Sequence, residues 1–595
     1  MKQIYLLSLI FSTSLFLVAC GGGSESPEPQ PQPAVVQTSV DPVAITSSNF
    51  NIYSGSIATL DGSGSYDSDG TISSYSWSQI EGTPVVTLSS PNSELASFTA
   101  PTVSSDTPLK FELTITDNDG LTSNASIIIT IQQKPTILTY YVSDCGVGAD
   151  PDCQPGDDSN DGISPATAWR TYDRAQDKWS NLVPGESILF ARGGVYEVVG
   201  SNQWVNTSST VNDPVTLSDY QPNWGSGNEQ LPRIVQNQND FVFSLADGGS
   251  AEVEQGYVFK NLYIQCNLSE SNNKAFFLYN DVDDVTIDTV TIDSCRIGVH
   301  AATSNPCSSS AQNCNGKSDR LTIKNATIIN NSSQGFLGSS EDLIIESTDF
   351  IANGSESSFD HNIYISNSSG ARISGNTLYQ STLDVNGACS GVSLVVHGET
   401  DGMIIENNTI YEDLGKANPN CWGISVDPGY NSAEGFTNII IRNNTITNVG
   451  NVSIGIASCE NCSIEDNIIT QNQAIGVTGI NAPVRQRGSN DLIMNEVNIH
   501  GNSIHFGADS SGTAISLGTE GTNHQITYNL IRFDGSSGFN CFKFDLAYSS
   551  YTDIDFNKCS YESSADGEWV DGVGDLATWQ QASGFSQNSE NVVPF

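Results

Sequence analysis

The stretch IIIRNNTIT, residues 439–447, carries the pattern from which the fold of this chain is predicted. An apolar strand leads into Asn444, and a second short strand follows. The same arrangement returns in MIIENNTIY (403–411), SIEDNIITQN (463–472), VNIHGNSIHF (497–506) and HQITYNLIRF (524–533). The repeated asparagines fall at 376, 408, 444, 467, 502 and 529, with spacings of 32, 36, 23, 35 and 27 residues. A constant unit joined by loops of variable length is typical of a solenoid.

An asparagine at the same turn of each coil has a physical role. Its side-chain amide bonds to the next coil, and the residue tolerates the bent backbone that a corner requires. Helical periodicity is nearly absent, and the evenly spaced strands and tight hairpins of a β-propeller are missing. We therefore expect an all-β chain whose main part, at ~200–560, is a parallel β-helix of about ten to twelve coils.

The N-terminus predicts export and anchoring. Lys2 precedes the apolar run IYLLSLIFSTSLFLVA, which is too short for a comfortable membrane span. The run ends in LVAC (17–20), which resembles the bacterial lipobox. That resemblance implies removal of residues 1–19, acylation of Cys20, a flexible tether over 20–40 and an outer-membrane lipid anchor at the cell surface or in the periplasm. An ordinary signal peptide with a coincidental cysteine is the alternative.

The net charge and the cysteine content limit which partners and which compartment we expect for this chain. The chain of 595 residues holds 22 Lys+Arg against 67 Asp+Glu, a formal charge of −45. No basic footprint exists to neutralise phosphates, so we expect no nucleic-acid partner. Without Cys20, the 13 cysteines leave 12, an even number that suits disulfides outside the cytoplasm. Cys459 and Cys462 predict a stapled turn rather than zinc, since no second such pair or nearby histidine supports a metal.

Residues 41–133 alternate apolar and polar side chains in short strands, as in KFELTIT and ASIIITI. The segments LDGSGSYDSDGTISSYSW, FTAP and LTITDNDG resemble PKD-type domains. The resemblance implies an immunoglobulin-like β-sandwich with Trp77 as a core aromatic residue. It also implies a spacer or a weak sugar or protein binder.

Residues 138–200 have a different sequence pattern from residues 41–133. YYVS, DDSNDGISPATAWRT and PGESILFARGGVYE resemble the N-terminal cap of secreted right-handed parallel β-helix enzymes, such as pectate lyases and related polysaccharide lyases. The resemblance implies a right-handed parallel β-helix domain over 138–595, with a cap at 138–200 and a C-terminal tail at 560–595. The loop DDSNDG (157–162) is rich in oxygen ligands, so Asp157, Asp158 and Asp161 are candidate Ca²⁺ ligands, although EF-hand spacing is missing.

Three neighbouring coils concentrate titratable residues. They are FDHNIYISN (359–367), GVSLVVHGETD (391–401) and CWGISVDPGYN (421–431). If the apolar residues of each strand point inward, alternation turns Tyr364, His397 and Asp427 outward. We expect these three side chains to stack on successive coils, within a slip of one residue.

This cluster suits β-elimination of a uronic-acid polymer. His397 is the candidate base, His361 the alternative base, and Tyr364 the acid. Asp360 or Glu399 would orient the imidazole. The candidates for neutralising the substrate carboxylate are Arg485, Arg487, Asn362 and a bound Ca²⁺, and Trp422 is a further candidate for binding the substrate. The β-helix lyases that the cap resembles often use Lys or Arg as base, and this segment lacks an obvious lysine, so no catalytic residue is transferred from them.

Other reactions remain open. Asp427 paired with Asp360, Glu399 or Asp401 would suit glycoside hydrolysis. C5-epimerisation of a polymer begins with the same proton abstraction as the lyase reaction, and a non-catalytic adhesion or glycan-binding β-helix needs no chemistry. The leading expectation is a monomeric, surface-anchored lyase acting on an anionic polysaccharide of the alginate, pectate or ulvan kind.

Overall fold

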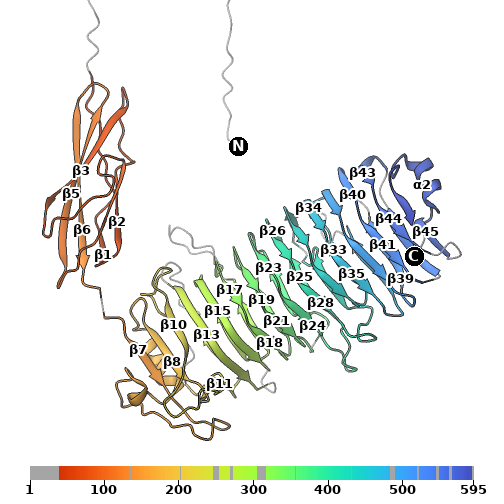
Figure 1. The fold of residues 1–595 in the computed structure, drawn as a ribbon, viewed down its shortest axis with the longest axis horizontal. Helices are drawn as coiled ribbons and strands as arrows, with labels where there is room; N and C mark the ends of the chain where they lie inside the picture. Colours follow the sequence, from red (N-terminus) through yellow and green to blue (C-terminus); the bar gives the residue numbers. More distant parts are fainter. Residues whose placement is uncertain are drawn as a thin grey trace, which may run out of the picture. The chain divides into compact units, whose positions relative to one another are not determined.

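The computed structural model describes residues 39–592 except 135, 201–202, 246–253, 268–271, 280, 304–315, 356, 431, 483–489, 519–520, 536, 545–547 and 562–565. The chain forms two compact units, Met1–Pro135 and Thr136–Phe595 (Figure 1). Within the described part, no helix has the length and apolar character needed to span a bilayer.

The first unit is a β-sandwich. One sheet has the order β1 (Phe50–Tyr53), β6 (Thr122–Gln132), β5 (Thr107–Asp117) and β3 (Ile72–Glu81), and β2 (Ile57–Asp61) pairs with β4 (Leu95–Thr99) in the other. Trp77 is 3% exposed and belongs to the core between the sheets. The predicted sandwich and its core tryptophan are confirmed.

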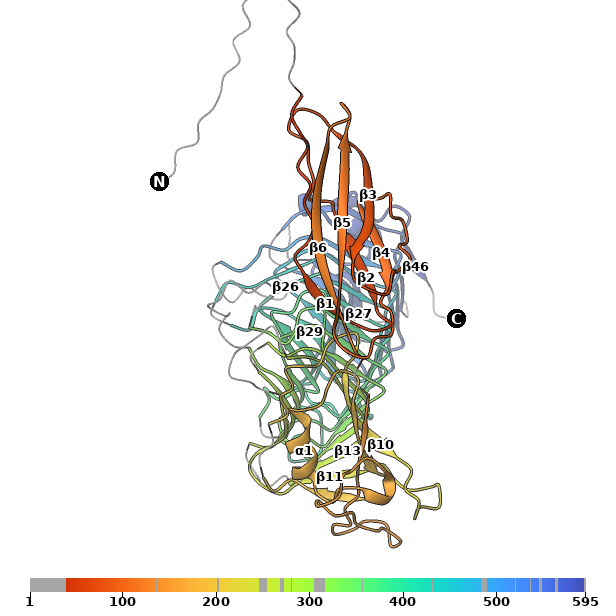
Figure 2. The ribbon, with the colours of Figure 1, turned by 90° about the vertical axis from the view of Figure 1, so that its left-hand side faces the viewer.

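The second unit begins with a cap formed by β7 (Thr139–Val142), a 3-10 turn (Pro165–Thr167), α1 (Tyr172–Trp179), β8 (Ser187–Ala191) and β9 (Val195–Glu197). The Thr171 side chain accepts a hydrogen bond from the Arg174 main-chain N–H and starts α1. Trp179 packs on Trp204 and Phe259, with ring centroids 5.3 and 5.5 Å apart. The helix thus closes the end of the coil, beside β10, β11 and β13 (Figure 2).

A parallel β-helix follows the cap, which confirms the predicted fold class. One face is a twelve-stranded parallel sheet with one strand from each coil. Its strands are β12 (Phe241–Ser244), β14 (Lys274–Leu278), β16 (Ile297–Ala301), β19 (Gln334–Gly338), β22 (Ile363–Ser366), β25 (Val392–His397), β29 (Trp422–Val426), β33 (Val452–Ile456), β36 (Gly476–Asn481), β39 (Ser511–Leu517), β42 (Ser537–Phe544) and β45 (Asp566–Val570).

The remaining faces form one 28-stranded sheet that includes β7, β8 and β9. Its other strands are β10 (Val215–Tyr220), β11 (Arg233–Gln236), β13 (Gln255–Cys266), β15 (Asp283–Asp293), β17 (Thr322–Lys324), β18 (Thr327–Ile329), β20 (Ile344–Glu346), β21 (Asp349–Ile351), β23 (Arg372–Ser374), β24 (Thr377–Tyr379), β26 (Glu399–Asp401), β27 (Ile404–Glu406), β28 (Thr409–Tyr411), β30 (Gly435–Thr437), β31 (Ile440–Arg442), β32 (Thr445–Thr447), β34 (Cys459–Glu465), β35 (Ile468–Gln471), β37 (Asn495–His500), β38 (Ser503–Phe506), β40 (His524–Thr527), β41 (Leu530–Phe533), β43 (Tyr551–Asp555), β44 (Lys558–Ser560) and β46 (Glu590–Val592). Near the C-terminus, α2 (Leu576–Ser583) packs Trp579 against Phe544, with ring centroids 5.2 Å apart.

The repeated asparagines form a buried ladder. The Nδ2 of Asn408 donates to Asn444 Oδ1 (2.9 Å), and the Nδ2 of Asn444 donates to Asn467 Oδ1 (3.0 Å) and to the Ile405 carbonyl (2.9 Å). The same side-chain bond joins all the ladder members, which are Asn376, Asn408, Asn444, Asn467, Asn502, Asn529 and Asn557.

The bent backbone lies one residue before each ladder asparagine. Asn407, Asn443 and Asp466 have φ of 57°, 54° and 52°. We expected the ladder asparagine itself to adopt the bend, and this expectation is wrong. The ladder residue needs a regular backbone to align its amide with the next coil, so its neighbour takes the left-handed conformation.

Five disulfides join described residues: Cys145–Cys153, Cys266–Cys295, Cys389–Cys421, Cys459–Cys462 and Cys541–Cys559. The predicted staple between Cys459 and Cys462 is present. The Cys389–Cys421 bond ties together the two loops that precede β25 and β29.

Glu412 makes stability depend on pH. It is 4% exposed, and burial, with Asp413 as a lesser cause, raises its pKa from 4.5 to about 8. The folded state then holds a proton that the unfolded state releases, so stability falls as pH rises from about 4.5 to about 8, by on the order of a few kcal/mol. We expect the free energy of unfolding of Glu412→Gln, measured by urea denaturation, to fall less between about pH 5 and about pH 9 than that of the wild type. Exposed Glu496→Gln is the control, and an unchanged decline in Glu412→Gln would contradict the assignment.

Candidate functional site

The outward face of the twelve-stranded sheet is hollowed over β22, β25 and β29. The cleft has a volume of about 560 Å³, and its lining includes five predicted residues: His361, Tyr364, His397, Trp422 and Asp427. Phe359 and Tyr430 belong to the same wall, on loops beside β22 and β29. The structure therefore brings together side chains from three successive coils.

The strand register explains how they meet. Tyr364 pairs with Val395, and His397 pairs with Ser366, so the tyrosine and the histidine are offset by two residues. The expectation that the two side chains stack within a slip of one residue is therefore wrong: their offset is two residues, an even number that still leaves both on the same face of the sheet. Asp427 directly follows Val426, which pairs with Val396, and so lies level with His397.

His397 has a fixed orientation. Its Nδ1 lies 2.5 Å from the Asp427 carbonyl oxygen and 3.9 Å from Asp427 Oδ1, and its side chain is 15% exposed. An Nδ1–H that donates to the carbonyl leaves Nε2 with a lone pair. Asp427 also accepts a hydrogen bond from the Ser425 hydroxyl (2.8 Å), so its carboxylate is held beneath the imidazole.

Gly429 leaves room for that imidazole. A Cβ at this position would lie 2.6 Å from both Nε2 and Cδ2 of His397, which is closer than side-chain atoms approach. The ring therefore lies directly against the backbone of the loop after β29.

We expect Gly429→Ala to displace the His397 ring and to reduce turnover by about 10- to 100-fold, since a misplacement of about 1 Å has effects of that size. Kinetic assays of the variant and the wild type on the same polysaccharides measure the loss. Gly476→Ala on β36 is the matched control, because its Cβ would lie 3.5 Å from its nearest neighbour, Ser511 Oγ. Wild-type turnover in Gly429→Ala would show that the ring position does not matter.

Tyr364 is surrounded by aromatic groups. Its hydroxyl lies 2.6 Å from the Tyr430 hydroxyl, and its ring centroid lies 5.4 Å from His397 and 5.6 Å from His361. Burial, followed by the hydrogen bond to Tyr430, raises the pKa of Tyr364 well above its ordinary value. The phenol therefore stays protonated and can donate. Sequence reasoning missed Tyr430, because it lies on a loop where no alternation indicates direction.

His361 differs from His397. It is 5% exposed, and its Nδ1 lies 2.9 Å from the Val392 carbonyl oxygen. Burial, assisted by the nearby His397, lowers the pKa of His361 to about 4. Such an imidazole is neutral near pH 7 and binds protons weakly, so it suits hydrogen bonding better than proton abstraction.

Other predicted residues lie elsewhere. Asp360 accepts from the Ser333 hydroxyl (2.8 Å) and the Ser357 N–H (2.6 Å), which places it in the preceding turn. Asn362 is 0% exposed and bonds to Asn353 inside the coil (2.9 Å), so it does not line the cleft as predicted; its corner position resembles that of the ladder asparagines.

Glu399 and Asp401 belong to β26 and line a separate hollow of about 570 Å³. The short turn at Gly398 carries the chain into the other sheet directly after His397, so Glu399 is not on the same face. Arg485 and Arg487 lie outside the described residues.

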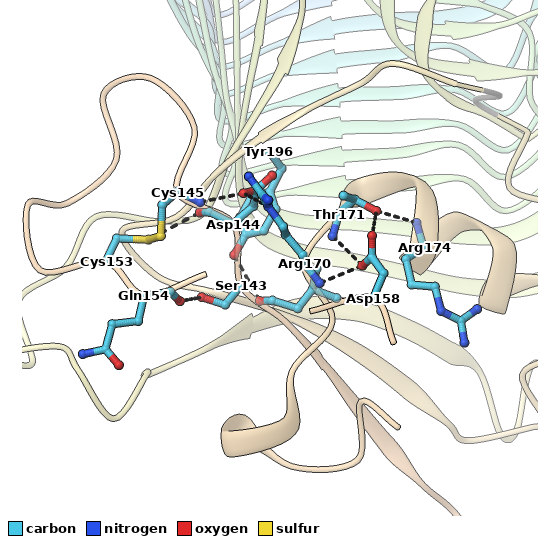
Figure 3. Close-up of polar contacts among 11 residues, drawn as sticks. Ser143, Asp144, Cys145, Cys153, Gln154, Asp158, Arg170, Thr171, Arg174 and Tyr196 are labelled. Carbon is cyan, nitrogen blue, oxygen red and sulfur yellow. Dashed lines mark hydrogen bonds and ion pairs between the residues drawn. A yellow bond between two sulfur atoms is a disulfide. The ribbon is translucent and has the colours of Figure 1, made fainter. Parts of the chain in front are cut away.

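The predicted calcium ligands are engaged locally. Asp157 accepts from Ser159, and Asp161 accepts from Ile163 and Thr167. Asp158 accepts from the main-chain N–H groups of Arg170 and Thr171 and from the Thr171 hydroxyl, which anchors the start of α1 (Figure 3). Their carboxylates do not converge on one point: the described residues offer two groups with ligand atoms within 4.8 Å, and neither includes these three. They do not fit a shared Ca²⁺.

Two family models match the chain. A PKD domain model covers residues 47–131, and the right-handed beta helix region model covers 310–482. No curated protein matches the chain.

Solved structures match in part. A nucleoside hydrolase-related protein of Saccharophagus degradans is 26% identical over 16% of this chain, which covers 26% of that protein, with a TM-score of 0.15. The family 28 exopolygalacturonase of Yersinia enterocolitica is 11% identical over 87% of this chain and 99% of its own, with a TM-score of 0.27. An alginate lyase from Paenibacillus sp. is 14% identical over 76% of this chain and 99% of its own, with a TM-score of 0.26.

Proposed function

We propose that the β-helix is a polysaccharide-active enzyme that cleaves a uronic-acid polymer by β-elimination in the cleft over β22, β25 and β29. One observation carries the proposal. The ring centroids of His397 and Tyr364 lie 5.4 Å apart in a single open cleft; the Asp427 carbonyl contacts His397 Nδ1, so that in the neutral Nδ1–H tautomer Nε2 can take a proton, and burial keeps the phenolic proton on Tyr364.

The reaction follows from these two states. His397 Nε2 takes the proton on the carbon next to the sugar carboxylate, and the electrons of that C–H bond form the new C=C bond. The bond from the neighbouring carbon to the glycosidic oxygen breaks, and the Tyr364 hydroxyl gives its proton to the leaving oxygen. Asp427 stabilises the imidazolium that forms. The Trp422 ring, in the cleft wall, offers an apolar face to a sugar.

Hydrolysis by two carboxylates fits the cleft less well. Such a reaction needs two acidic groups flanking the bond. Among the described cleft residues Asp427 alone carries a carboxylate, and it is 2% exposed. C5-epimerisation is the second candidate, since His397 would perform the same proton abstraction without bond cleavage.

A panel of purified polyuronates tests the proposal. We expect ultraviolet absorbance from unsaturated uronate and new reducing ends to rise together, and both to be absent in His397→Ala. Reducing ends alone would indicate hydrolysis. A changed uronate composition without cleavage, read by NMR, would indicate epimerisation, and no change with any polymer would overturn an enzymatic role.

Membrane anchoring remains part of this proposal. If Cys20 carries lipid, Cys20→Ala should move the protein from the membrane fraction to the soluble fraction, because the acyl chains supply the membrane affinity. Fractionation followed by immunoblotting measures the shift. Wild-type protein that is already soluble and uncut before Cys20 would refute the anchor.

A further inference from the structure

The groove continues beyond Tyr364. A second hollow of about 430 Å³ shares Tyr364 and Tyr430 with the cleft and is lined by His300, Gln334 and Leu337 among others. The outward side chains Leu337 and His300 pair in register with Tyr364 along the sheet. The two hollows therefore meet at the Tyr364–Tyr430 pair and follow the same face of the β-helix.

Lys274, on β14, lies further along the sheet in register with Ile297 and then Gln334, and its ammonium group lies over Phe277, which pairs with His300. Its Nζ is 4.5 Å from the ring centroid of Phe241 and 4.7 Å from that of Phe277, and the residue is 7% exposed. Among the described residues, no carboxylate lies within ion-pair distance of this ammonium. A largely buried lysine is normally paired, and this chain has 67 acidic residues against 22 basic ones to pair it with.

The second hollow, two coils along the sheet from Lys274, lacks acidic side chains among its described residues. By contrast, the hollow around β26 contains Glu341, Glu399, Asp401 and Glu434. The His300 ring lies 5.4 Å from the Phe277 ring, and its buried Nδ1 has no hydrogen-bond partner among the described residues. Burial and the nearby Lys274 and Arg296 cations lower the pKa of His300 to about 4, so this ring is neutral near pH 7.

We infer that the face from Gln334 to Lys274 binds a negatively charged sugar unit of the same polymer. With coils ~4.8 Å apart, the four steps from β14 to β25 span roughly 19 Å. The anionic unit would therefore lie several sugars from the bond at His397, so the groove would hold the interior of a long acidic chain. This inference rests on the proposed function for its substrate class, but binding requires no chemistry.

Binding in a His397→Ala background tests the inference apart from turnover. The probes are long and short oligosaccharides of alginate and of polygalacturonate, with dextran as the neutral control, measured by titration calorimetry. We expect Lys274→Met to weaken binding of the long acidic oligosaccharides about tenfold and to leave the short ones unchanged. The matched control is Lys543→Met, which removes a cation at the other end of the same sheet, where Lys543 lies 3.7 Å from Asp571.

A second variant guards against misfolding of the first. Leu337→Trp fills the hollow without changing its charge. It should also weaken the binding of the long acidic oligosaccharides and leave that of the short ones unchanged. Unchanged affinity in both variants, or an equal loss in Lys543→Met, would overturn the inference, as would failure of every acidic probe to bind. Selective loss in a protein that cleaves none of the polymers would support this binding face and refute the lyase.

Discussion

Tyr364→Phe and His397→Ala should each reduce turnover by about a hundredfold or more, since removing a proton-transfer group costs about 10²–10⁴-fold in rate. Tyr364→Phe keeps the ring between His361 and His397 and removes only the hydroxyl that would protonate the leaving oxygen. Single-turnover kinetics of the wild type and both variants on the same polysaccharide measures both effects. The melting temperature should change little, because both side chains face the cleft rather than the core.

Matched controls lie away from the cleft. Tyr379→Phe removes a hydroxyl that donates to Asp413 at 2.6 Å, and His505→Ala removes an imidazole that pairs with Asp534 at 2.8 Å. Both should turn over at the wild-type rate. If activity and melting temperature fall together in the cleft variants, the residues support the fold. If neither falls, the reaction occurs elsewhere on the β-helix.

Asn444→Ala should lower the free energy of unfolding by about 3 kcal/mol or more, because a buried group left without its partner costs about 1–3 kcal/mol. Asn444 Oδ1 accepts from both the main-chain N–H (3.0 Å) and the side-chain Nδ2 (2.9 Å) of Asn408, so the substitution leaves two buried donors without that acceptor. It also removes the bonds from Asn444 to Asn467 and to Ile405. Urea denaturation followed by circular dichroism measures the change.

Thr409→Ala is the control for this experiment, since Thr409 is exposed on β28, next to ladder residue Asn408. It should cost less than about 0.5 kcal/mol. An Asn444→Ala variant as stable as Thr409→Ala would mean that the coils are stabilised by their apolar core alone.

The sequence predicts the repeating parts of this molecule well. Strand alternation and the asparagine spacing are local patterns that follow directly from backbone geometry, and they predict the coil, the ladder and the outward direction of Tyr364 and His397. Alternation alone does not give register, because the turn between each ladder asparagine and the next outward strand varies in length. The sequence therefore places Tyr364 and His397 on one face but misses their offset of two residues.

Side chains at corners and on loops are the least predictable. Asn362 follows Asp360 and His361 in a polar run, and only the three-dimensional coil shows that it turns inward to Asn353. Tyr430 and Gly429 complete the surroundings of His397 from a loop whose path depends on Glu434, which accepts hydrogen bonds from the main-chain N–H groups of both. Such contacts have no signature in the spacing of residues along the chain.

The asparagine ladder also bears on how such a protein acquires a new specificity. Adjacent ladder members are separated by as few as 23 and as many as 36 residues, yet each pair is joined by the same side-chain bond. Insertions between two ladder asparagines therefore leave the hydrogen bonds of the ladder intact. The longest interval, the 36 residues from Asn408 to Asn444, contains Trp422 and Tyr430 of the cleft wall. Lengthening a coil between two ladder asparagines can thus reshape the cleft without changing the rest of the β-helix. This route is open to evolution and to protein engineering by loop grafting.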